Sequence, residues 1–194
     1  MVKLIAKNVL FVFVVFLAYF VPAKLGFLIS LPSDNATAIW PASGMAAAGV
    51  IFFGYRTLPG VFFGSLIANL TNFLSVAELF TPQIFNFLDT TFFIAIGATI
   101  ESFTVAFIIR KLIGYPSSLS HWRDILILFI IAGMVGSIPS PTIGVTTLHI
   151  KGFIPLSNYF YNWWTWWIGN SLGIIVCTPI LVAMFTPTEY ISVR

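Results

Sequence analysis

The chain has 194 residues, of which 59% are hydrophobic and only 8% are charged, and its mean hydropathy is +1.00. An ordinary soluble domain has about 25% charged residues, so this composition excludes a water-soluble fold. The net charge of +3 comes from scattered basic residues and gives nucleic-acid binding no support. Each crossing of a bilayer needs about 20 apolar residues, so the expected fold is an all-α bundle of about six transmembrane helices.

The first predicted helix covers residues 5–30. Its start imitates a signal peptide, because Lys3 and Lys7 precede the apolar run 9–21. The apolar stretch then resumes and becomes long enough to cross the membrane. We therefore expect a retained first helix that acts as a signal anchor.

Five further apolar runs follow, separated by polar residues, glycine and proline. They predict helices over residues 40–54, 57–73, 84–110, 124–148 and 158–185. The second and third are short and are predicted to form a tight helical hairpin, in which the GxxxG spacing of Gly60 and Gly64 favours close helix approach. In the fifth, residues 140–145 are predicted to interrupt the helix after Pro139, so that this half faces the bundle interior.

Basic residues predict the orientation of the bundle. With the N-terminus inside, the outer segments hold two basic residues, Lys24 and Lys151. The cytoplasmic segments hold the other seven, namely Lys3, Lys7, Arg56, Arg110, Lys111, Arg123 and Arg194. This positive-inside bias predicts that both termini are cytoplasmic and that residues 31–39, 74–83 and 149–157 lie outside.

The predicted second helix starts with Trp40, Pro41 and Ser43. Proline suits the first turn, where its missing N–H costs nothing. The free amides of such a helix N-terminus can attract an anionic ligand group, with Trp40 and Ser43 beside it. The alternative is capping without a ligand.

Two acidic residues lie within the predicted fourth helix, and an ionisable group inside a membrane is a functional hypothesis by default. Asp89 lies near the outer end, and Glu101 lies about 18 Å deeper, so the two cannot share one small ligand. Glu101 is predicted to face polar groups such as Asn170 of the last helix. For Glu101 the alternative is a hydrogen bond that only holds the bundle together. For Asp89 the alternative is a structural or solvated role.

The last helix opens with a run of aromatic residues over 159–167. Trp163, Trp166 and Trp167 share a face by their spacing, and with Asn162 this run predicts an outward-facing pocket for an apolar or cationic ligand. The alternative is an aromatic belt at the outer interface. Four tryptophans in five positions cannot all face lipid on one helix, so some must pack inward.

No catalytic or metal site is expected. His121 and His149 are predicted on opposite sides of the membrane, and the sequence contains no HExxH motif, nucleophile elbow or phosphate-binding loop. The single cysteine, Cys177, excludes an intrachain disulfide. We expect no enzyme activity and no cofactor.

The chain resembles a known family in several of these segments, at residues 39–44, 54–60, 101–110 and 144–148, and most densely at 163–173. This family is the bacterial membrane-associated sensor domain of the first type, which forms the N-terminal input domain of histidine kinases and diguanylate cyclases. The family usually has aspartate where this sequence has Asn170, which keeps a hydrogen-bonding group at that position but removes an ionisable one. The family domain also usually has more spans.

The resemblance implies one integral-membrane sensory domain over residues 1–194, without activity of its own, in the inner membrane of a bacterium. We expect it to bind a small ligand between the second, fourth and sixth helices on the outer side. It would then pass the signal to a cytoplasmic kinase, cyclase or phosphodiesterase module, acting as a dimer. The chain is either truncated before further helices or that module, or a short stand-alone protein. One alternative is the substrate-capture subunit of an energy-coupling vitamin transporter. Another is a purely structural membrane module.

Overall fold

The computed structural model describes residues 2–29, 39–75, 78–82, 84–115 and 121–185. These residues form helices and their connections, with no strand among them, which confirms the all-α prediction. Two parts of the predicted topology lie outside the described residues. They are the connection 31–38 and the terminal segment 186–194, which includes Arg194.

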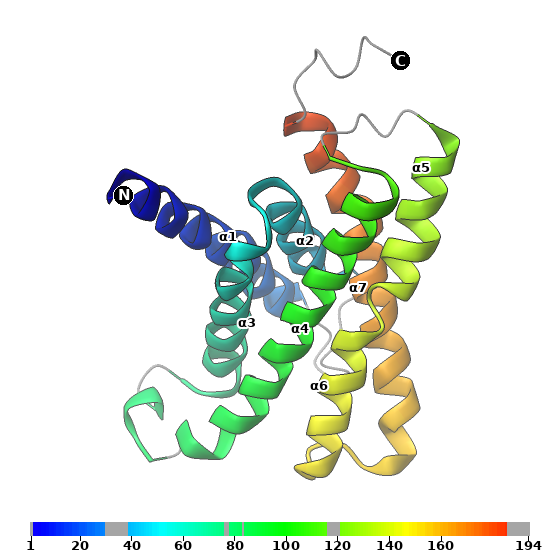
Figure 1. The fold of residues 1–194 in the computed structure, drawn as a ribbon. Coiled ribbons are helices and arrows are strands. Elements are labelled where there is room, and N and C mark those ends of the chain that lie inside the picture. The colour runs from blue at the N-terminus through cyan, green and yellow to red at the C-terminus, as the bar shows by residue number, and fades with distance from the viewer. Residues whose placement is uncertain (1, 30–38, 76–77, 83, 116–120, 186–194) are drawn as a thin grey trace.

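The helices follow one another with short connections (Figure 1). In chain order they are α1 (Val2–Ile29), α2 (Pro41–Phe53), η1 (Tyr55–Thr57), α3 (Leu58–Phe73), η2 (Glu78–Phe80), α4 (Ile84–Leu112), α5 (Trp122–Leu126), η3 (Ile127–Val135), α6 (Pro139–Ile150) and α7 (Leu156–Phe185).

Four of the described helical segments are long and apolar enough to cross a membrane, where the sequence predicted about six. They are Ile5–Leu28, Phe87–Leu112, Trp122–Ile150 and Leu156–Phe185. Helix α2 has 13 residues and α3 has 16, so they are only about 20 Å and 24 Å long. The hydrocarbon core is about 30 Å thick. Both helices are therefore shorter than a span, and α2 is apolar along its length.

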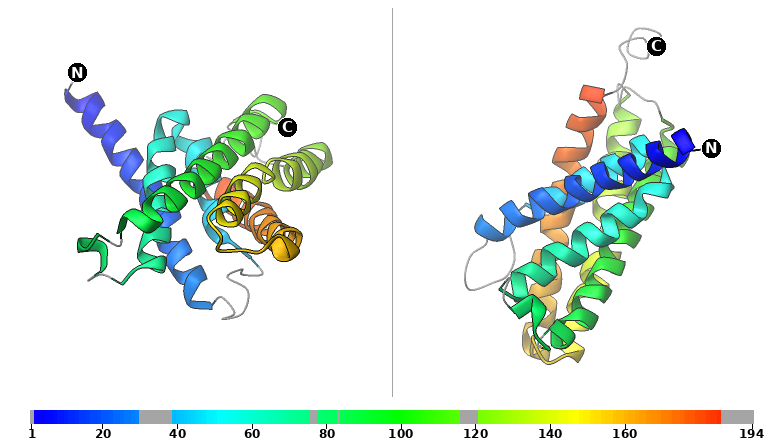
Figure 2. Two further views of the ribbon diagram at one scale, coloured as in Figure 1. Left: turned by 90° about the horizontal axis from the view of Figure 1, so that it is seen from below. Right: turned by 90° about the vertical axis from the view of Figure 1, so that its left-hand side faces the viewer.

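The bundle has two distinct ends. The terminal end is the one at which α1 begins and α7 finishes, and the loop end is the one at which α3 connects to α4 and α6 connects to α7 (Figure 1). Helix α1 crosses the other helices obliquely and begins well away from them at the terminal end (Figure 2). The start of α1 and the finish of α7 thus share one end of the bundle.

Small residues let α3 lie directly on α1. A Cβ atom at Gly60 would lie 2.3 Å from the carbonyl oxygen of Val12, and one at Gly64 would lie 3.0 Å from that of Phe16. The predicted close approach at these glycines is therefore present. The partner is α1 and not α2, so the prediction of a tight hairpin between the second and third helices is wrong. Helix α2 instead packs mainly against α7, α1 and α4.

The predicted fifth helix is one interrupted span made of α5, η3 and α6. Segment η3 is a π-helix, and the interruption falls at residues 136–138, so residues 140–145 belong to the regular helix α6. The predicted position of the break was therefore wrong by a few residues. Pro139 starts α6 rather than breaking a helix, because proline fits the first helical turn.

Candidate functional site

Helix α2 begins inside the bundle. The backbone N–H of Trp40, the residue before α2, donates a hydrogen bond to the carbonyl of Gly169 at 2.8 Å. Gly169 lies near the middle of α7, about 20 Å from its first residue. The sequence predicted that the second helix starts at the outer surface. In the structure α2 is a half-helix that starts near mid-depth and runs to the terminal end.

Glycines bring α2 and α7 into backbone contact at this level. A Cβ atom at Gly173 would lie 1.9 Å from the carbonyl oxygen of Trp40, and one at Gly44 would lie 2.1 Å from that of Gly173. The hydroxyl of Thr178 donates to the carbonyl of Gly44 at 3.1 Å. The first turn of α2 is thus held against α7 with no side chain between the two backbones.

A buried polar cluster lies at the start of α2. Nδ2 of Asn170 on α7 donates to Oε2 of Glu101 on α4 at 2.8 Å, and the hydroxyl of Ser43 on α2 also hydrogen-bonds the Glu101 carboxyl. The side chains of Glu101 and Asn170 are each 1% exposed. We call Ser43, Glu101 and Asn170 the polar centre. It joins α2, α4 and α7, the three helices that the sequence predicted to meet, but near mid-depth and not on the outer side.

Glu101 has only neutral hydrogen-bond partners in the described structure. The two ion pairs found among the described residues are Lys151–Asp89 and His121–Asp124. The N-terminus of α2 adds a partial positive charge, because helix dipoles leave about half a unit charge at that end. A carboxyl group in this setting can bind a donor or a cation. The described residues contain no group of three His, Cys, Asp or Glu that could hold a metal ion.

Two polar contacts flank the polar centre, and the sequence did not predict either of them. Tyr19 of α1 is 4% exposed and hydrogen-bonds the side chains of Ser65 and Trp40. The buried hydroxyls of Ser137 and Ser171 lie 2.7 Å apart and join the interruption before α6 to α7. No sequence signal marked Tyr19, because the structure alone shows that Val15, Tyr19 and Ala23 form a buried row on α1.

Trp40 lies beside the polar centre. Its indole packs on α1, where a Cβ atom at Gly26 would lie 2.7 Å from the ring, and its centroid is 5.1 Å from that of Phe27. Together with its hydrogen bond to Tyr19, these contacts place Trp40 at the junction of α1, α2 and α7. Trp40 and Ser43, both predicted as site residues, are thus brought close to Glu101 and Asn170.

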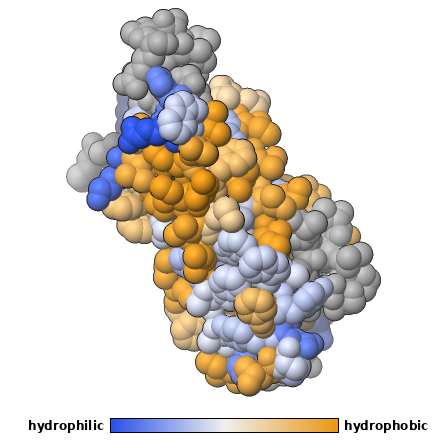
Figure 3. Space-filling view, turned by 90° about the vertical axis from the view of Figure 1, so that its right-hand side faces the viewer, coloured by the Kyte–Doolittle hydropathy of each residue, from blue (hydrophilic) through white to orange (hydrophobic). Residues whose placement is uncertain are grey.

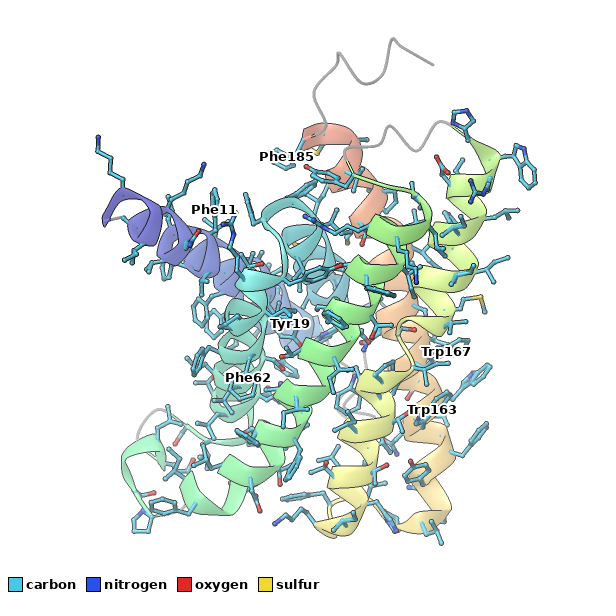
Figure 4. The ribbon with its side chains drawn as sticks, viewed as in Figure 1. Phe11, Tyr19, Phe62, Trp163, Trp167 and Phe185 are labelled. Carbon is cyan, nitrogen blue, oxygen red and sulfur yellow. The ribbon has the colours of Figure 1, made fainter. Side chains whose placement is uncertain are left out.

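The predicted aromatic pocket residues lie elsewhere on α7. Nε1 of Trp163 donates to Oγ1 of Thr142 at 3.0 Å, and Nε1 of Trp167 donates to the carbonyl of Met134 at 2.8 Å. The rings of Trp163 and Trp167 stack at 6.0 Å and point away from α4 (Figure 4). The amide of Asn162 donates to the carbonyl of Asn158 in its own helix. The structure does not bring these three residues to the polar centre.

The face that carries these aromatics is divided into two regions. Below a hydrophilic upper edge, strongly hydrophobic residues cover the middle of this face, and less hydrophobic residues gather over its lower part, towards the loop end (Figure 3). Trp166 is the inward-facing member of the aromatic run, because a Cβ atom at Gly144 of α6 would lie 2.7 Å from its ring. The expectation that some of these tryptophans pack inward is confirmed.

Asp89 forms an ion pair with Lys151, which follows α6 at the loop end. Both side chains are partly exposed, and Oδ1 of Asp89 also accepts the backbone N–H of Thr90 at 2.7 Å. Asp89 and Glu101 are far apart along α4, as predicted. The eight predicted site residues therefore fall into three places, and only Trp40, Ser43, Glu101 and Asn170 lie together.

The far end of α2 has its own set of contacts. The guanidinium of Arg110 on α4 donates to the carbonyl of Ile51 and lies over the rings of Tyr55 and Tyr115, at 5.6 Å and 5.7 Å. Phe52 packs on Phe185, the last residue of α7, with centroids 5.8 Å apart. Helix α4 thus holds α2 at both ends, with an acid at its N-terminus and a base at its C-terminus, as the helix dipole favours.

The family model MASE1 matches residues 9–189 of the chain. No curated protein and no solved structure gives a significant match.

Proposed function

Because the chain belongs to the MASE1 family of membrane-associated sensor domains, we propose that it is a non-catalytic input domain that binds a small ligand at the polar centre. The domain passes the resulting change to a cytoplasmic kinase, cyclase or phosphodiesterase module. In this proposal the protein lies in the inner membrane of a bacterium with both termini in the cytoplasm, and it acts as a dimer.

One observation carries the choice of site. The hydrogen bond between Asn170 and Glu101 lies at the first turn of a half-helix inside the bundle. Ionisable groups and interrupted helices at membrane depth are costly and typically mark ligand or ion sites. The proposed site contains Trp40, Ser43, Glu101 and Asn170. It leaves out Asp89, Asn162, Trp163 and Trp167, which have partners of their own.

The route of the signal is α2. Its first turn contacts Glu101 and α7, and its last turn contacts Arg110 and Phe185 at the terminal end. A ligand that changes the contacts of Glu101 changes how firmly the first turn of α2 is held. Because α2 is a single short helix, a shift at one end moves the other. The ligand must bind two arrangements of α2 with different affinity for this to transmit a signal.

The test uses a receptor that carries this domain ahead of its output module. Glu101→Gln keeps the size of the side chain and removes its charge, so we expect it to change the basal output by about fivefold or more, the lower range of allosteric coupling. Asp89→Asn is the matched control, since it removes the paired carboxyl of the same helix. Output that is unchanged by Glu101→Gln would contradict the proposed site.

The second half of the test addresses the route. Arg110→Gln removes the contacts at the far end of α2, and we expect it to abolish the effect of Glu101→Gln on the output. Arg56→Gln is its control, because Arg56 is exposed and, among the described residues, donates to the carbonyl of Phe53 at the same helix end. If Glu101→Gln still changes the output in the Arg110→Gln receptor, the signal does not pass through α2.

A further inference from the structure

Asn170 leaves one oxygen atom of the polar centre without a partner. Its Nδ2 faces Glu101, whereas its buried Oδ1 accepts no hydrogen bond within the described structure. The hydroxyl of Ser102, the residue after Glu101, is also buried and without a partner. Unsatisfied buried polar atoms are rare, and each calls for an explanation such as a bound ion.

The charge of Glu101 is also incompletely balanced. Helices α2 and α3 and segment η3 contain no titratable side chain. On α1, Tyr19 is the group that interacts electrostatically with Glu101. On α7 the titratable groups are Tyr159, Tyr161 and Cys177, and on α6 the titratable group is His149. Within the described structure, this carboxyl therefore faces two neutral donors and the partial positive charge at the N-terminus of α2.

We propose that the polar centre binds one small monovalent cation, a sodium ion or a proton, between the carboxyl of Glu101 and Oδ1 of Asn170. This inference rests on the proposed function and names the ligand class of the same site. Half-helices in membrane proteins commonly border such ion sites. A single carboxylate suits a single positive charge, and the carboxylate disfavours an anionic ligand at this place.

The two cations would use the site differently. A sodium ion would bind carboxylate lone pairs and Oδ1 directly. A proton would turn the Glu101 carboxyl into a hydrogen-bond donor for Oδ1 after the amide of Asn170 has rotated by half a turn, because the acid has an O–H group that the carboxylate lacks. In both cases Oδ1 of Asn170 gains a partner, and the contact between Glu101 and Ser43 changes. That contact joins the first turn of α2 to α4.

The experiment measures the unfolding temperature and the tryptophan emission of the whole chain in lipid nanodiscs. In the sodium arm, NaCl replaces choline chloride at constant ionic strength and mildly alkaline pH. In the proton arm, pH is lowered in choline chloride and the infrared C=O band of a protonated carboxyl is recorded. We expect a rise in the unfolding temperature with the logarithm of the cation concentration in one arm, because the cation binds only the folded state.

Variants decide whether the effect belongs to this site. Glu101→Gln should abolish the rise and the infrared band, and Asp89→Asn should keep both. Asn170→Asp adds a second carboxyl and should tighten cation binding about tenfold or more, which provides a test even if Glu101→Gln folds poorly. No response in either arm, or a response that Glu101→Gln leaves intact, overturns the inference.

These outcomes are distinct from failure of the proposed function. If no cation effect is found but Glu101→Gln still changes the output of the receptor, the sensory role stands and the cation site fails. If the cation binds but Glu101→Gln leaves the output unchanged, the cation site stands and the sensory role of the polar centre fails.

Discussion

At the scale of single residues, Glu101 is held in the membrane interior by hydrogen bonds and not by an opposite charge. Its amide partner on α7 and its hydroxyl partner on α2 come from different helices. Each of these bonds therefore helps to hold two helices together. Interhelical hydrogen bonds in membranes are worth about 0.6 kcal/mol on average, but a bond to a buried carboxyl is worth more, since losing the donor leaves that group unpaired.

Asn170→Ala tests this difference. We expect it to lower the free energy of unfolding by about 2 kcal/mol, because the Glu101 carboxyl loses its amide donor. Asn162→Ala is the matched control on the same helix and should cost less than about 0.5 kcal/mol, since among the described residues its partly exposed amide donates within α7. The measurement is equilibrium unfolding in mixed micelles. If the two variants lower the free energy of unfolding equally, the hydrogen bond of the polar centre contributes no more to stability than a bond within one helix.

Residue-scale prediction succeeded where the signal was an unusual residue type. A carboxyl inside an apolar helix needs a polar partner, and the nearest candidate on the last helix was Asn170. It failed for Tyr19 and Ser102, because tyrosine and serine are common in membrane helices and nothing in the sequence marks which of them are buried. The sequence also gave no sign that Asp89 would form an ion pair with Lys151, which follows a different helix.

At the scale of helices, the contact between α2 and α7 is a contact of backbones. Three groups meet there, namely Gly44, Gly173 and the carbonyl of Trp40. Side chains on either helix would push the start of α2 away from Asn170 and so open the polar centre. The geometry of the site therefore depends on two residues that have no side chain.

Gly44→Ala and Gly173→Ala should each lower the free energy of unfolding by about 1–3 kcal/mol, because the added Cβ meets backbone atoms that cannot move aside. Gly97→Ala on α4 is the control. Its nearest neighbour would be the carbonyl oxygen of Ser140 at 3.2 Å, and a gain of helix propensity of about 1 kcal/mol offsets the tighter contact. Thermal unfolding of the three variants provides the comparison. A neutral Gly173→Ala would contradict the close contact.

The lengths of helices were harder to predict than their existence. Apolar runs identified all the main helices to within a few residues, because hydropathy is a local property. The runs for α2 and α3 did not show that these helices are too short to cross the membrane. The GxxxG spacing at Gly60 and Gly64 indicated a close helix contact but not that its partner would be α1.

At the scale of the whole molecule, the orientation in the membrane remains a prediction. It rests on the excess of basic residues in segments that would be cytoplasmic. In the structure, Lys111 lies at the terminal end and Ser157 at the loop end, and both are exposed. These two residues therefore report the two sides of the membrane.

Single cysteines at these positions test the orientation. In a Cys177→Ser background, Ser157→Cys should react with a membrane-impermeant maleimide in intact cells, because the loop end faces outwards. Lys111→Cys should react only after the membrane is made permeable. The readout is the labelled fraction of the protein on a gel. The reverse pattern would invert the topology and place the terminal end outside.

The sequence by itself determined that this protein is a helical membrane protein, which residues are polar inside it, and which family it resembles. These properties follow from residue types and their spacing along one segment. Only the tertiary structure decided the depth at which α2 begins and the helix that Gly60 and Gly64 contact. It alone brought Ser43, Glu101 and Asn170 together. Those facts depend on where helices that are distant in sequence cross. The crossing points are set by side chains from several segments packing together, and no single segment encodes that packing.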